Sequence, residues 1–214
     1  MKNFRSINSF KTILSIAGAF AIVGCTSIMG GSSEPSREEV TQLLKTSFAE
    51  KGSAKLDRLD QSDLQQSCSA YATSEMPKEL KARLEKAAEE GVKYPADGKY
   101  LGDWREGERI AQNGRGLQFS DAPNTVGGGN CYACHAIDKK ELSYGNIGPS
   151  LAQYGKLRGN SDPIQKYTWA RIWNSHVFNA CNSMPRFGAA GILTEQQIKD
   201  VMALLLDPNS PVNR

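Results

Sequence analysis

Histidine is scarce in this chain. Only two of the 214 residues are histidines, and the five cysteines lie far apart except for one pair, Cys131 and Cys134. A structural zinc site needs four ligands, usually in two closely spaced pairs, and no second pair is present. Net charge is also small, because after Cys25 the chain has 23 basic and 23 acidic side chains. This balance gives no sign of nucleic-acid binding.

The closely spaced cysteines are followed directly by a histidine, so that Cys131, Cys134 and His135 form the pattern Cys-x-x-Cys-His. This is the attachment pattern of c-type haem, in which each thiol bonds to a vinyl group and the imidazole binds iron. A thioredoxin-like redox pair usually opens a helix after a buried strand, whereas here the glycine-rich stretch 127–130 precedes the pair. The sequence therefore predicts one covalently bound haem c, with Cys131 and Cys134 as thioethers and His135 as an axial ligand.

The amino terminus has the pattern of an export signal. Basic residues occur over 2–11, and an apolar run of twelve residues follows over 13–24. This run is too short to span a bilayer but is typical of a signal peptide. It ends in Gly24-Cys25, which resembles a bacterial lipobox. We expect a signal peptide over 1–24, lipidation of Cys25 and a flexible tether over 25–35; the alternative is an ordinary signal peptide cleaved nearby. Either reading predicts a periplasmic protein, and lipidation of Cys25 would also anchor it to the membrane.

Two further cysteines, Cys68 and Cys181, remain, 113 residues apart. In an oxidising compartment a remaining pair favours a disulfide, and closing such a loop would stabilise the fold by about 4–5 kcal/mol. Cys181 also lies three residues before Met184. Two alternatives stay open: Cys181 could bind iron as a thiolate, or both thiols could be free.

Local patterns predict an all-α fold. Capping boxes, with serine or threonine three residues before glutamate or glutamine, mark helix starts at Ser36 and Thr194. Pro77 and Pro163 mark two further helix starts. A turn over 94–98 separates a helical extension, residues 36–93, from a haem domain, residues 94–214. We expect a loop with a short turn over 52–66. The expected helices cover residues 36–48, 77–90, 103–113, 162–179 and 194–206.

Three residues near the predicted haem have expected roles. Gly107 within a helix costs up to about 1 kcal/mol against alanine, which favours close approach of another helix there, although a merely tolerated glycine is the alternative. A histidine ligand normally donates its second ring N–H to a carbonyl. We expect the Pro149 carbonyl to accept this bond, unless residues 148–149 only form a turn. Trp169 is expected to form a wall for the haem plane.

The second axial ligand has several candidates. Met202 lies in an apolar helical stripe, which favours core packing, and His176 could be a surface or capping histidine. Met184 lies in a loop that Pro185 stiffens, and a weak thioether ligand suits such a pre-positioned loop. We favour Met184, with His176, Cys181 or an open site as alternatives. Histidine–methionine ligation raises the haem potential and fills both axial positions.

These motifs resemble class I cytochromes c, in which the first and last helices cross closely. More narrowly, the chain resembles the SoxX family, the mono-haem subunits of SoxAX complexes, over about Tyr94 to Asn213. The resembling strings are residues 94–99, 129–135, 148–151, 154–159 and 181–188.

The resemblance implies a role in bacterial thiosulfate oxidation. The partner subunit SoxA would join thiosulfate oxidatively to a cysteine of the carrier SoxYZ, acting as an L-cysteine S-thiosulfotransferase. This chain would be a non-catalytic subunit that accepts the two released electrons one at a time and passes them to a downstream cytochrome. The alternatives are a free-standing periplasmic electron shuttle of a respiratory chain and a haem enzyme or gas sensor with an open iron.

Overall fold

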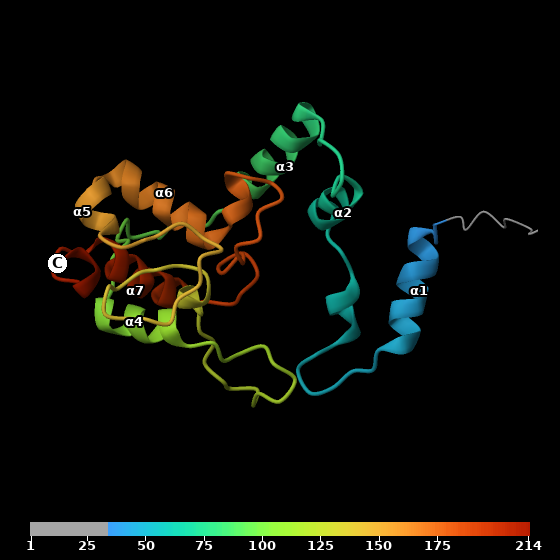
Figure 1. Ribbon diagram of the computed structural model, residues 1–214, viewed down its shortest axis with the longest axis horizontal. Coiled ribbons are helices and arrows are strands. Elements are labelled where there is room, and N and C mark those ends of the chain that lie inside the picture. Colours follow the sequence, from blue (N-terminus) through green and yellow to red (C-terminus); the bar gives the residue numbers. More distant parts are fainter. Residues whose placement is uncertain (1–33) are drawn as a thin grey trace, which may run out of the picture. The chain divides into compact units, whose positions relative to one another are not determined.

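A computed structural model describes residues 34–214 (Figure 1). The predicted signal peptide, Cys25 and nearly all of the tether lie outside these residues. The described residues form helices joined by long loops, without a β-strand, so the all-α prediction is confirmed. The α-helices are α1 (Arg37–Ser47), α2 (Asp63–Ala70), α3 (Lys78–Glu90), α4 (Trp104–Gln112), α5 (Tyr154–Arg158), α6 (Asp162–Trp173) and α7 (Glu195–Leu206). The 3-10 helices are η1 (Leu56–Leu59), η2 (Cys131–Ala133), η3 (Ser175–Val177) and η4 (Pro211–Asn213).

The first and last helices of the haem domain, α4 and α7, pack directly against each other (Figure 1). The predicted capping box opens α7: Thr194 accepts from the Gln197 N–H, and the Gln197 side chain accepts from the Thr194 N–H. At the crossing, Gly107 of α4 lies against the backbone of Asp200, and a Cβ atom there would overlap the Asp200 carbonyl oxygen. The close approach expected at Gly107 is therefore confirmed.

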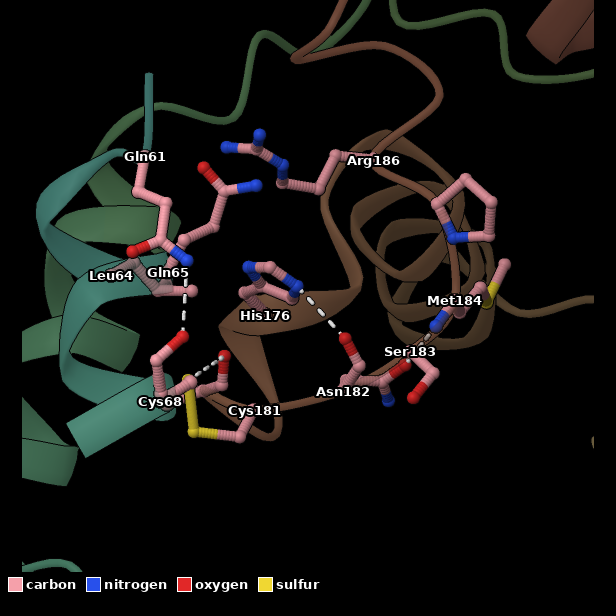
Figure 2. Close-up of a pocket in the computed structure, with 13 residues that line it drawn as sticks. Gln61, Leu64, Gln65, Cys68, His176, Cys181, Asn182, Ser183, Met184 and Arg186 are labelled. Carbon is pink, nitrogen blue, oxygen red and sulfur yellow. Dashed lines mark hydrogen bonds between the residues drawn. A yellow bond between two sulfur atoms is a disulfide. The ribbon is translucent and has the colours of Figure 1, made fainter. Parts of the chain in front are cut away.

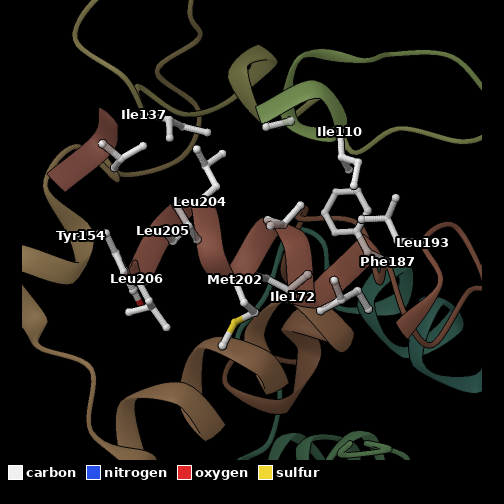
Figure 3. Close-up of a cluster of buried hydrophobic side chains, with 14 of the residues drawn as sticks. Ile110, Ile137, Tyr154, Ile172, Phe187, Leu193, Met202, Leu204, Leu205 and Leu206 are labelled. Atoms are coloured by element: carbon white, nitrogen blue, oxygen red, sulfur yellow. The ribbon is translucent and has the colours of Figure 1, made fainter. Parts of the chain in front are cut away.

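Helix α7 provides much of the hydrophobic core (Figure 3). Its apolar residues recur around the whole helix, and Met202 and Leu204 are among those with no exposed surface. Trp169 of α6 is equally inaccessible; it meets Tyr100 edge to face and stacks on Trp173 at 6.1 Å between ring centroids. Packing in this core holds α4, α6 and α7 together, and these helices support the loops between them.

Two predicted boundaries are wrong. The expected loop over 52–66 contains η1 and the start of α2, which opens with a second complete capping box between Ser62 and Gln65. The helix expected over 162–179 ends at Trp173. There Asn174 becomes extended, and its side chain accepts from the His176 N–H to open η3 instead. A side chain that competes for backbone donors explains this early end.

The helical extension is joined to the haem domain by specific contacts. Helix α3 packs against η3, and the indole N–H groups of Trp169 and Trp173 donate to the carbonyls of Lys93 and Gly91. A disulfide joins Cys68 of α2 to Cys181. Residues 37–214 accordingly form one compact unit. No helix among the described residues is long and apolar enough to cross a membrane.

Candidate haem-binding site

The two cysteines of the motif lie on η2, a single turn that follows a left-handed residue, Asn130 (φ 46°). The N–H groups of Cys134 and His135 both donate to the Cys131 carbonyl, which closes the turn. Both thiols are free and partly buried. A Cβ atom at Gly129 would lie 3.0 Å from the Cys131 sulfur, so glycine leaves room for this side chain. The turn thus presents two unpaired thiols directly before a histidine.

The His135 ring is oriented by the loop that follows it. Its Nδ1 lies 2.7 Å from the Pro149 carbonyl oxygen, so the structure contains the hydrogen bond expected from the sequence. A carbonyl can only accept, and the proton must therefore be on Nδ1, which leaves a lone pair on Nε2. Gly148 lies so close that a Cβ atom would overlap the imidazole. Hydrogen bond and contact together fix one tautomer and one orientation, as a metal-binding histidine needs.

The Met184 loop is held on both sides of the methionine. The Met184 N–H donates to the Asn182 side-chain oxygen at 2.6 Å, and the Ser175 hydroxyl donates to the Met184 carbonyl at 2.7 Å. The His176 Nε2 in turn lies 3.0 Å from the Asn182 carbonyl. The Met184 side chain is partly buried and packs against the core. The Met184 backbone is therefore held in place by hydrogen bonds on both sides; its role as an iron ligand remains a prediction.

The structure limits the alternatives for the second axial ligand. Cys181 is bonded to Cys68, with 5.5 Å between their Cα atoms, so it offers no thiolate and the two thiols are not free. Met202 is buried in the middle of α7, where it packs in the core. His176 is also buried, and its Nε2 is used by the loop. Of these candidates, only Met184 is neither disulfide-bonded nor buried.

These residues fit a haem c. Cys131 and Cys134 supply two free thiols, His135 supplies an unprotonated Nε2, and Met184 supplies a thioether, which is the donor set of a histidine–methionine cytochrome. Trp169 has no exposed surface, and its N–H is occupied by the Lys93 carbonyl. Its role as a wall of the haem plane remains a prediction.

A polar cluster beneath the motif was not predicted from the sequence. The Tyr132 hydroxyl donates to Glu108 of α4 at 3.0 Å and accepts from the Asp138 N–H. Burial raises the pKa of Glu108, against the lowering effect of the Tyr132 hydrogen bond, and burial likewise raises the pKa of Tyr132. Burial also raises the pKa of the Cys131 thiol to about 12. The cluster joins η2 to α4. The only sign of it in the motif is Tyr132, which occupies one of the two unspecified positions of Cys-x-x-Cys-His.

Comparison with known proteins agrees with this site. Residues 105–207 match the model of the cytochrome c family. A protein of Aquifex aeolicus (strain VF5), named "Uncharacterized lipoprotein", is 44% identical over 126 residues, which cover 58% of this chain and 58% of that protein. The chain thus matches somewhat more than half the length of this relative. Residues 105–207 thus match a cytochrome c family model, and the described residues have the all-α fold that the class I type would have; a cytochrome c domain implies a covalently bound haem c.

Proposed function

We propose that this protein is a periplasmic mono-haem cytochrome c that carries electrons and has no substrate-converting site of its own. The observation that supports this most is the pairing of a fixed His135 with a Met184 loop held by two hydrogen bonds to the methionine backbone. A bound haem c supplies a one-electron ferric–ferrous couple at such a site. If His135 and Met184 both hold this group, small molecules would be kept from its iron.

The surrounding residues keep this arrangement the same in both oxidation states. The Pro149 carbonyl holds the proton on the His135 Nδ1, so that Nε2 remains the coordinating atom. Ser175 and Asn182 hold the Met184 backbone whether or not its sulfur is bound. A site that moves little between states reduces the reorganisation that accompanies electron transfer. This is the behaviour expected of an electron carrier.

We further propose that the chain is the SoxX-type subunit of a SoxAX complex. Its strings 129–135, 148–151 and 181–188 carry the resemblance, and all three lie within the compact unit of residues 37–214. SoxA would be the direct partner, and the SoxYZ carrier would bind to the complex of the two subunits. A downstream cytochrome would accept the electrons. A lipidated Cys25 would anchor the protein at the membrane, which fits the name of the Aquifex relative.

The ligand assignment is tested by Met184→Ala, with Met202→Leu as the control in the core. We expect the first variant to lower the midpoint potential, because a methionine ligand raises it. The reduced protein should also bind carbon monoxide, because one ligand position of the iron becomes free. The control should leave both properties unchanged. An unaltered spectrum and potential in Met184→Ala would show that another group binds the iron.

The SoxAX assignment is tested separately by capture of the tagged holoprotein from periplasm. We expect a second haem subunit to copurify and thiosulfate to reduce the haem of this chain when SoxYZ is added. A monomer that is reduced only by respiratory complexes would instead identify a free-standing shuttle.

A further inference from the structure

A cavity of about 380 Å³ lies between α2 and the Met184 loop (Figure 2). One wall comes from the extension, including Gln61, Gln65 and Cys68, and the other from the haem domain, including His176 and Arg186. The Cys68–Cys181 disulfide lies at the edge where the two walls meet. The Met184 loop, Met184 included, also lines this space, but the proposed electron transfer needs no ligand in it.

The cavity contains a buried nitrogen without a partner. His176 is only 8% exposed, and its Nδ1 has no hydrogen-bond partner among residues 34–214. Because the Asn182 carbonyl at Nε2 can only accept, the proton lies on Nε2 and Nδ1 carries a lone pair. In Figure 2 the ring lies among the lining residues with its Nε2 edge turned toward Asn182. A buried acceptor without a partner destabilises the structure, so a ligand that donates a hydrogen bond to Nδ1 would bind favourably there.

The same cavity contains an uncompensated positive charge. Arg186 lines it, and in the described part of the chain its guanidinium has neither an ion pair nor a hydrogen bond. Burial lowers the pKa of His176, and although its hydrogen bond to Asn182 opposes this, the charge of Arg186 lowers the pKa further. The positive charge of Arg186 is thus close enough to disfavour protonation of the imidazole, which helps to keep Nδ1 unprotonated near neutral pH.

The extension adds a further donor. The Gln65 side-chain oxygen is occupied by the Ser62 N–H and hydroxyl. Its Nε2 makes no hydrogen bond within the described residues, and it faces the same cavity. No aspartate or glutamate is among the described residues that line the cavity. The walls therefore offer a cation and an amide donor for acceptor oxygens, together with one acceptor for an O–H group.

We propose that this cavity binds a small oxyanion that keeps one O–H group, such as hydrogenphosphate or hydrogencarbonate. The O–H group would donate to the His176 Nδ1, and the unprotonated oxygens would accept from Arg186 and Gln65. Planar guanidinium groups suit such oxyanions because they offer several donors in one plane. A fully deprotonated oxyanion of equal charge would leave Nδ1 unpaired and would bind more weakly.

The test is a calorimetric titration of the full-length holoprotein at about pH 8, where inorganic phosphate is mainly the dianion with one O–H group. Sulfate, a dianion without hydrogen, is the matched ligand at equal ionic strength. We expect phosphate to bind about tenfold more tightly, because only phosphate can donate a hydrogen bond to the otherwise unpaired Nδ1. Equal affinity for the two anions, or no binding of either, would overturn the proposal.

Variants identify the binding groups. Arg186→Gln should weaken phosphate binding by about tenfold or more, because a charge-assisted bond is lost. Arg158→Gln, at an exposed arginine outside the cavity, should bind phosphate as the unaltered protein does. The same loss in both variants would indicate general attraction to positive charge and would contradict the site.

A measurement on the unaltered protein avoids any effect of substitutions on folding. The nitrogen resonance of the His176 Nδ1 should shift when phosphate is added, and it should shift less with sulfate. If an internal donor such as Arg186 or Gln65 already pairs with Nδ1 in solution, neither anion will move this resonance, and the proposal would be wrong.

Discussion

The two proposed iron ligands are positioned in different ways. His135 is set by nearby residues: a one-turn helix, the Pro149 carbonyl and Gly148, all within fourteen positions of the histidine. Met184 is also held by nearby residues, Ser175 and Asn182. Its loop is in addition joined to a distant part of the chain, because the disulfide at Cys181 reaches back 113 residues to Cys68 of the extension.

This difference assigns a role to the extension. On the imidazole side, the haem domain is self-sufficient, because every contact described comes from residues 108–149. On the thioether side, α2 is covalently joined to the loop that carries Met184. A weak ligand benefits most from a backbone that cannot move away. The extension therefore stabilises the side of the site on which the metal–ligand bond itself contributes least.

The largest effect is expected from removing the disulfide. The variant Cys68→Ser/Cys181→Ser should lower the free energy of unfolding by about 4 kcal/mol, because a closed loop of 113 residues is released. Urea denaturation of the holoprotein measures this loss. Carbon monoxide should also bind the reduced variant faster, since the Met184 loop is less constrained. If stability falls while carbon monoxide binding stays slow, the extension does not hold the loop.

The imidazole side is tested by Gly148→Ala. The added methyl group would overlap the His135 ring, and such overpacking costs about 3 kcal/mol in a site that cannot relax. Denaturation again measures the loss, with Gly91→Ala as the control. There the new Cβ would lie 3.5 Å from its nearest neighbour, an ordinary contact. Equal stability of the two variants would mean that the ring is not confined by Gly148.

A smaller effect is expected from Ser175→Ala. The serine is fully buried, and its loss leaves the Met184 carbonyl without this donor, at a cost of about 1 kcal/mol. Ser183→Ala, at an exposed serine of the same loop, should be neutral. A small fall in the midpoint potential should accompany Ser175→Ala alone. Identical potentials in the two variants would remove Ser175 from the support of the ligand.

The smallest effect is a pH dependence on the imidazole side. Burial raises the pKa of Glu108 in the folded protein above its ordinary value of 4.5, despite the Tyr132 hydrogen bond. The folded state therefore holds this proton more tightly than the unfolded state, so this group's stabilising contribution is present below pH 4.5 and is lost as the pH rises through the raised pKa. Denaturation over this range should show the slope, and Glu108→Gln should remove it. An unchanged slope in the variant would assign the effect to another group.

Local patterns predicted much of this molecule. Cys-x-x-Cys-His fixed the turn at η2, the Thr194 capping box fixed the start of α7, and the spare cysteine pair indicated a disulfide that the structure contains. Gly107 was informative because a glycine in a helix needs a reason, and α7 provides one. Each of these signals consists of a few residues whose chemistry allows few alternatives.

Other features depend on contacts that no local pattern encodes. Helix α2 has a capping box, but its short polar sequence lacks an apolar stripe, and the disulfide holds it in place. The early end of α6 depends on the Asn174 side chain competing for a backbone donor. The support of Met184 by Ser175, and the orphaned nitrogen of His176, depend on how η3 folds against the loop.

The most direct test of the central claim is to purify the exported protein, denature it, and then treat the native reduced form with carbon monoxide. The account predicts one haem that stays attached to the denatured chain through Cys131 and Cys134, and slow or absent carbon monoxide binding in the native state. A chain that releases its haem on denaturation, or a native ferrous form that binds carbon monoxide at once, would contradict it.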